Sequence, residues 1–298
     1  MLHRIPVLGG LFGRPDVDES EAAKTHRLAL IEGMTFEVIP LKSLTEAEAA
    51  LPAGARVSVT ASPAKGLEVT QEITERMLGA GFQAIPHISA RMVRDRAHTK
   101  ELAEWLRDTG VATMFLVGGD MDPPGDYKDA VEFLTDLLDC NHGLSTIGVT
   151  AYPDSHPLID NETLHKALHD KQQLLADAGI AGYCSTQMCF DPSMISRWIK
   201  AERAAGMTLP VHLGLSGVVD RTKLLTMGAR LGIGQSLSYL RKNRKAITSM
   251  MTTANYDPNN LLLPLSQDLL EHDVQGLHVF TFNQVAATDE WRLAEASD

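Results

Sequence analysis

Short apolar runs alternate along the chain with longer segments in which apolar residues recur at helical spacing. Short runs rich in Val, Ile, Thr and Phe indicate strands, whereas a period of about 3.6 residues indicates amphipathic helices. The runs predict eight strands, at residues 35–39, 56–60, 84–88, 112–117, 145–151, 183–188, 210–214 and 277–282. The segments between them predict helices at residues 69–79, 99–110, 127–138, 161–178 and 192–205, followed by helices around 220–232, 235–251 and 260–271.

Strands that alternate with helices are typical of a parallel sheet. Eight such strands suit a closed (β/α)8 barrel, which typically takes about 250 residues. A doubly wound open sheet is the alternative, but no GxGxxG motif opens the first helix, and polar residues end nearly every strand. We therefore predict an α/β protein with a single TIM-barrel catalytic domain at residues 31–298, preceded by an N-terminal arm or capping helix at residues 1–30.

Polar side chains recur where the predicted strands end, and this is the working face of a (β/α)8 barrel. They are Glu37, Thr60, His87, Asp120, Tyr152, His156, Gln187, Thr281 and Asn283. Any one of them could be an ordinary packing or edge residue. Charged groups within short apolar strands are costly unless they are paired or functional, so the recurrence at one end favours a site. We expect buried carboxylates on the first and fourth strands and a flat, hydrogen-bonding heterocycle as the ligand.

The tightest glycine turn is Gly118-Gly119-Asp120, at the end of the fourth predicted strand. Glycines at such a position let a ligand approach the backbone closely, although an ordinary turn between strand and helix would look the same.

Composition narrows the classes of protein further. The net charge of −11 and the pI of about 5.4 argue against a protein that mainly binds nucleic acid or an anionic membrane face. No apolar run is long enough to span a membrane, and the N-terminus does not resemble a signal peptide. The three cysteines lack ligand spacing, as expected for reduced thiols. We expect a cytoplasmic protein.

Histidines give little indication of a metal. His165 and His169 lie four residues apart on a predicted helix, but the glutamate that follows the first histidine in zincin metalloproteases is missing. Asp154-Ser155-His156 does not complete a ligand set either. The sequence therefore predicts no metal site.

Seven segments in chain order resemble motifs of the methylenetetrahydrofolate reductase family. They are Phe36-Glu37-Val38-Ile39-Pro40, Val57-Ser58-Val59-Thr60, Pro86-His87-Ile88, Gly119-Asp120 with Pro123-Pro124-Gly125, residues 151–157, Asp177-Ala178-Gly179 with Thr186-Gln187 and Phe190-Asp191, and residues 278–283. One such match would be weak, but seven in the right order are specific.

The resemblance implies a barrel that binds FAD at the carboxyl ends of its strands. NADH or NADPH would reduce the flavin, which would convert 5,10-methylenetetrahydrofolate to 5-methyltetrahydrofolate. Glu37 would be the general acid that opens the folate's five-membered ring, and burial would favour its protonated form. Asp120 would lie between pterin and flavin and tune the flavin.

The same resemblance implies two sets of ligand contacts. Contacts with the folate would come from Asp120, Gln187, Phe190 and Asn283, and contacts with the flavin from Thr60, His87, Gly119, Asp120, Tyr152, His156 and Lys171. The expected partners are a tetrahydrofolate derivative and a nicotinamide nucleotide, and the chain is a candidate for a homo-oligomer.

Three positions depart from the family pattern. Gly118 and Gln284 stand where the family has arginine, and Lys171 is followed by residues 172–175, Gln-Gln-Leu-Leu, where the family has basic residues near the flavin phosphates. Charge-assisted contacts to a diphosphate are strong, so their loss weakens FAD binding. Either FAD binds more loosely through Lys171 and other donors, or hydride passes directly from nicotinamide to folate. The eroded positions also leave open a catabolic tetrahydrofolate enzyme on the same barrel, or a folate-binding barrel without catalysis.

Overall fold

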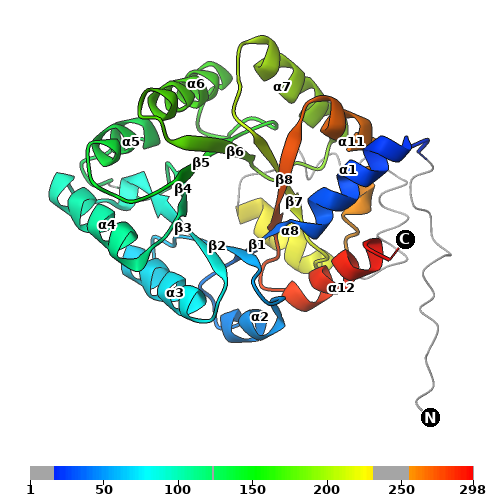
Figure 1. Ribbon diagram of the computed structural model, residues 1–298, viewed down its shortest axis with the longest axis horizontal. Helices are drawn as coiled ribbons and strands as arrows, with labels where there is room; N and C mark the ends of the chain where they lie inside the picture. Colours follow the sequence, from blue (N-terminus) through cyan, green and yellow to red (C-terminus); the bar gives the residue numbers. More distant parts are fainter. Residues whose placement is uncertain (1–16, 123, 231–254, 298) are drawn as a thin grey trace.

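The computed structural model describes residues 17–122, 124–230 and 255–297. Eight parallel strands close into a barrel in chain order, and the helices surround it (Figure 1). The strands are β1 (Thr35–Val38), β2 (Arg56–Val59), β3 (Gln83–Ser89), β4 (Thr113–Val117), β5 (Thr146–Ala151), β6 (Ala181–Thr186), β7 (Val211–Ser216) and β8 (Val274–Phe280). The predicted (β/α)8 barrel is confirmed, and each predicted strand overlaps an observed one.

Of the described helices, one precedes β1 and each of the others comes after a strand. They are α1 (Glu21–Glu32), α2 (Leu44–Ala50), α3 (Leu67–Gly79), α4 (Arg96–Thr109), α5 (Ala130–Leu138), α6 (Asn161–Asp177), α7 (Pro192–Ala204), α8 (Arg221–Arg230), α11 (Asn259–Glu271) and α12 (Val285–Glu295), with a 3₁₀ turn at Ala90–Met92. The hydrophobic pattern did not predict α2 and α12. The helix predicted around 235–251 lies outside the described residues.

Aspartate caps fix where four of these helices begin. Asp95, Asp129, Asp160 and Asp191 each accept a hydrogen bond from a backbone N–H in the first turn of α4, α5, α6 and α7. The first N–H groups of a helix have no partner within it, so such a cap stabilises the helix by about 1 kcal/mol.

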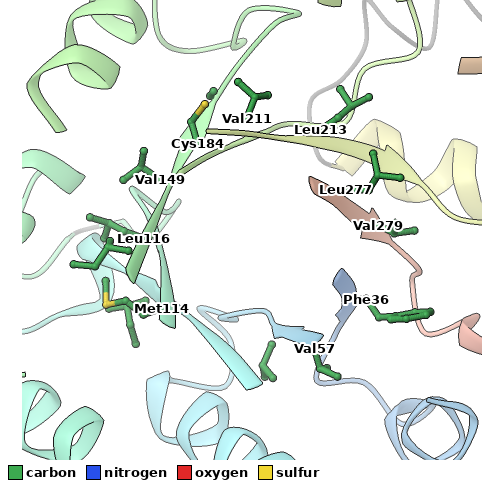
Figure 2. Packing of buried hydrophobic residues seen from close by; sticks show 14 of the residues in the cluster. Phe36, Val57, Met114, Leu116, Val149, Cys184, Val211, Leu213, Leu277 and Val279 are labelled. Atoms are coloured by element: carbon green, nitrogen blue, oxygen red, sulfur yellow. The ribbon is translucent and has the colours of Figure 1, made fainter. Parts of the chain in front are cut away.

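The core lies between the strands and the surrounding helices. Figure 2 shows Phe36, Val57, Leu116, Val149 and Leu277 on the outer face of the ring of strands, and all of them are at most 2% exposed. Side chains alternate across a strand. Because Phe36 and Val38 face outward into this core, Glu37 between them must face the interior of the barrel.

Aromatic rings fill the interior of the barrel beside two glycines, Gly148 on β5 and Gly276 on β8. A Cβ atom on Gly148 would lie 2.3 Å from Tyr183 Cζ, and one on Gly276 would lie 2.7 Å from His212 Cδ2. The Tyr183 and His212 rings stack with centroids 4.1 Å apart. The two glycines therefore leave room for this pair of rings inside the barrel.

Helix α1 packs against α11, α12 and β8. Arg27 binds Glu19 and Glu295 through its guanidinium, and the Glu295 carboxylate also accepts from the amide of Asn259. The proposed boundary at residue 30 falls within this helix, which spans Glu21–Glu32. Among the described helices, none combines the length and apolar character needed to cross a bilayer.

Replacing Gly148 with alanine should destabilise the barrel by about 1–3 kcal/mol, because the new methyl group would overlap the rings of Tyr183 and Phe115. Urea unfolding measures the change. Gly79→Ala is the matched control, since a Cβ there meets nothing within 4 Å and alanine favours a helix by up to about 1 kcal/mol. Equal unfolding midpoints for the two variants would contradict this account of the interior.

Candidate functional site

A cavity of about 540 Å³ opens where the strands end. Its volume is in the range of small-molecule sites, about 300–1,000 Å³. The predicted site residues in its lining are Glu37, Thr60, His87, Gly119, Asp120, Tyr152, His156 and Gln187. The structure therefore brings together most of the ring of polar residues that the sequence suggested.

Two predicted substrate contacts lie behind this lining instead of in it. Phe190 is buried and packs edge-on against Tyr256, with ring centroids 5.3 Å apart. The Asn283 amide accepts from Ile39 N at 2.9 Å and donates to Ile39 O at 2.9 Å. Asn283 thus ties the end of β8 to the segment after β1, and it supports Ile39, which does line the cavity.

Lys171 does not reach the cavity either. It is buried on α6, and its Nζ donates to Thr150 O at 3.5 Å. Burial lowers the pKa of its ammonium group to about 8. The side chain is therefore directed at the strand layer and does not line the cavity, and its contact with a flavin phosphate stays a prediction.

Asp120 lines the cavity but is exposed, so the expectation of a buried carboxylate on the fourth strand was wrong. Strand β4 ends at Val117, and the two glycines that follow turn the chain away from the barrel. Gly119 has φ +89°, and a Cβ there would lie 1.8 Å from Ser89 Oγ. The turn thus requires glycine and places the Asp120 carboxylate at the mouth of the cavity.

Glu37 lies deepest among the lining carboxylates and belongs to a buried network. Its Oε2 lies 2.9 Å from His278 Nε2 and 3.9 Å from His87 Nε2. His87 Nε2 in turn lies 2.6 Å from Ser58 Oγ. Since Glu37, His87 and His278 are each at most 6% exposed, this group holds its protons away from bulk water.

The register of the closed barrel creates this network. Glu37 is paired with Ser58 on β2 and with Phe280 on β8, and the hydroxyl of Thr281 donates to Glu37 O at 2.6 Å. His278 and Ser58 were not predicted as site residues from the sequence. Their alternation with outward-facing apolar neighbours was a usable signal, but the contact of His278 with Glu37 depends on barrel closure.

Burial and the proximity of His278 hold the pKa of His87 well below its usual range. His87 is therefore neutral at physiological pH, and the shorter contact of the Glu37 carboxyl is with His278 at 2.9 Å. This pair can hold a proton and pass it to a ligand above it. The same three side chains place ligand atoms within 4.8 Å of one another, a spacing that a metal ion could also use.

One polar atom in the lining points to a ligand. The Thr60 hydroxyl oxygen is buried and, among the described residues, has no hydrogen-bond partner. Buried polar groups are normally paired, so a ligand that reaches Thr60 would complete its hydrogen bonding. Phe115, Phe280 and Phe282 add apolar surface to the same cavity. This combination suits a flat heterocycle with polar edges.

The described lining offers no cationic side chain for the diphosphate of FAD. Within the residues that the structure describes, no lysine or arginine borders the cavity. Diphosphates are normally held by charge-assisted contacts with such side chains or by helix N-termini. The described part of the site thus suits a pterin or an isoalloxazine ring and shows no cationic contact for a diphosphate.

Residues 40–291 match the methylenetetrahydrofolate reductase family. The chain belongs to this family. Methylenetetrahydrofolate reductase 2 from Saccharomyces cerevisiae is 29% identical over 140 residues, which are 46% of this chain and 22% of the yeast protein. The match thus spans only about a fifth of that relative's length.

Among solved structures, an uncharacterized Clostridium thermocellum protein that binds two copies of 5-methyl-5,6,7,8-tetrahydrofolic acid is similar. The TM-score is 0.58 and the identity is 14%, with 92% of this chain and 96% of that chain covered. At this identity the likeness shows the fold alone, and the reductase family membership rests on the sequence match.

The buried histidines make stability depend on pH. Burial, with Arg56 and His278 nearby, lowers the pKa of His212 to about 3, whereas an unfolded histidine titrates at about 6.5. The unfolded chain therefore binds more protons below about pH 6.5, so the free energy of unfolding should fall as the pH drops through this range. The largest slope for one histidine is about 1.4 kcal/mol per pH unit.

Urea unfolding at about pH 7.5 and about pH 5 measures this slope. His212→Asn should reduce the loss of stability between the two conditions, whatever its effect at the higher pH. An undiminished slope in this variant would show that His212 takes up its proton in the folded state.

Proposed function

We propose that this protein reduces 5,10-methylenetetrahydrofolate to 5-methyltetrahydrofolate, with a reduced nicotinamide nucleotide as the source of hydride. The observation that carries the proposal is the buried carboxylate of Glu37, 2.9 Å from His278, at the floor of a cavity whose lining suits a flat heterocycle. Membership of the reductase family supports it.

In the proposed reaction, N10 of the folate accepts the proton. In the product the one-carbon unit is on N5 as a methyl group, so its bond to N10 must break and N10 must gain a proton. Ring opening leaves an iminium carbon that accepts hydride. The overall reaction consumes one proton and one hydride, and Glu37, hydrogen-bonded to His278, supplies the proton at N10.

The rim residues would orient the pterin. Gln187 uses its Oε1 to accept from Met188 N at 2.8 Å, which leaves its amide NH₂ group as the end that binds a ligand. Asp120 at the mouth would accept hydrogen bonds from the pyrimidine edge. Thr60 supplies a buried hydroxyl that such a ligand would satisfy.

FAD, when bound in this family, would relay the hydride between nicotinamide and folate. In the described ranges no lysine or arginine borders the cavity, and Lys171 Nζ donates to Thr150 O instead of lining it, so no described cation is placed to hold the diphosphate of FAD. NADH and NADPH also carry a diphosphate, but a co-substrate that leaves after each turnover can bind more weakly than a cofactor that stays bound. We therefore favour the second route that the sequence left open, in which hydride passes directly from nicotinamide to the folate.

An absorption spectrum of the purified protein distinguishes the two routes. We expect no flavin band near ~450 nm and turnover of methylenetetrahydrofolate with NADH or NADPH without added FAD, since the described cavity offers no cation for a diphosphate. Co-purification of one FAD per chain, with activity lost on its removal, would establish the flavin route instead.

Replacing Glu37 with glutamine should lower kcat by about 10²–10⁴-fold, because the amide keeps the shape of the side chain but cannot donate the proton. Binding of 5-methyltetrahydrofolate, measured by calorimetry, should change much less. Glu32→Gln, on the exposed face of α1, is the matched control and should retain full activity. Turnover of the Glu37 variant at the wild-type rate would remove Glu37 from the mechanism.

A further inference from the structure

We propose that His165, His169 and Glu202 form a binding site for a divalent transition-metal ion on the outer layer of the barrel. His165 and His169 lie one turn apart on α6, and Glu202 lies in the last turn of α7. Figure 1 shows these two helices in succession around the barrel. The site is independent of the proposed reductase activity.

One carboxylate oxygen joins the three side chains. Glu202 Oε2 lies 2.9 Å from His165 Nδ1 and 2.9 Å from His169 Nε2, and the two imidazole centroids are 4.3 Å apart. One ligand atom from each residue falls within 4.8 Å of the others. Two imidazole nitrogens and one carboxylate oxygen are a donor set that Zn²⁺ and Co²⁺ bind well.

The observed spacing is close to what a metal needs. Ligand atoms about 2.0–2.1 Å from a tetrahedral zinc ion lie roughly 3.3 Å from one another. The two nitrogen–oxygen distances of 2.9 Å would therefore have to lengthen by a few tenths of an ångström. The His165 side chain is 47% exposed, so it can make this adjustment by a small rotation.

Because the Glu202 carboxylate is buried, a cation bound to it would lower the cost of burying its charge. Glu202 is only 7% exposed, and the ion pairs formed by its carboxylate within the described chain are with these two histidines. A buried carboxylate is costly unless it is paired or bound to a metal. Hydrogen bonds from the two imidazoles satisfy the oxygen that they contact, whereas a divalent ion would also neutralise the charge of the carboxylate.

The surroundings leave room for further ligands. His165 and Glu202 line a groove of about 360 Å³ between α6 and α7, together with Asn161, Arg197 and Trp198. Water molecules or a small anion can complete the coordination from this groove. The site would thus have three protein ligands and at least one open position, the arrangement typical of exchangeable metal sites.

Two other clusters of possible ligands must be separated from this one. Glu37, His87 and His278 belong to the proposed reductase site, and the third cluster combines Asp268, Glu271 and His272. In the third cluster Asp268 already binds Lys200 at 2.8 Å. Variants of Glu37 and His272 therefore serve as controls for the metal titration.

Titration of the purified full chain with Co²⁺, followed by visible absorption, and with Zn²⁺, followed by calorimetry, tests the site. Wild-type protein should bind one ion with the d–d absorption of a four- or five-coordinate cobalt site. Loss of one direct ligand in His165→Asn, His169→Asn or Glu202→Gln should weaken binding by at least about tenfold, since even indirect partners of metal ligands contribute about 10–100-fold. Glu37→Gln and His272→Asn should bind as wild type does.

Circular dichroism of each metal-free variant verifies folding, and His165→Asn, at a half-exposed position, keeps the test available if the Glu202 variant does not fold. The proposal is overturned if wild-type protein binds neither ion at about 100 µM. It is equally overturned if binding disappears in Glu37→Gln or His272→Asn but persists in the variants of all three proposed ligands.

Discussion

The hydrogen bond between Glu37 and His278 joins the first strand of the barrel to the last inside its polar interior. It exists only because the sheet closes, since β1 pairs with β8 on one side and with β2 on the other. Phe36 and Val38 occupy the apolar layer outside, so the side chain between them cannot avoid the interior. The partner histidine gives the buried carboxyl group a hydrogen bond, which reduces the cost of burying it.

The rest of the site is arranged around this pair. Small residues such as Gly148 and Gly276 let large rings fill the barrel below it, and the residues at the strand ends leave a cavity above it. The Gly118-Gly119 turn carries Asp120 out to the mouth. A flat ring bound in this cavity would meet a buried acid on one side and hydrogen-bonding groups at the rim, whereas the described lining offers no cation for a diphosphate.

Much of this could be predicted from local patterns, because strand length, helix period and polar strand ends are properties of neighbouring residues. The position of Glu37 at the site could be predicted in this way, from a polar residue near the end of a short apolar strand. His278 lies 241 residues away from it, and its role follows from barrel closure, which no local pattern specifies. The burial of Lys171 against Thr150 of β5 is likewise set by packing between helix and strand, which no local pattern specifies. Glu202 likewise completes the histidine pair of α6 from another helix, so its spacing in the sequence carried no signal.

A crystal structure of the protein with bound 5-methyltetrahydrofolate tests the central claim most directly. The account predicts the pterin in the cavity at the strand ends, with N10 within hydrogen-bond reach of the Glu37 carboxylate, about 2.6–3.2 Å, and Gln187 and Thr60 in contact with the ring system. A folate bound elsewhere on the barrel, or bound in the cavity with N10 remote from Glu37, would contradict it.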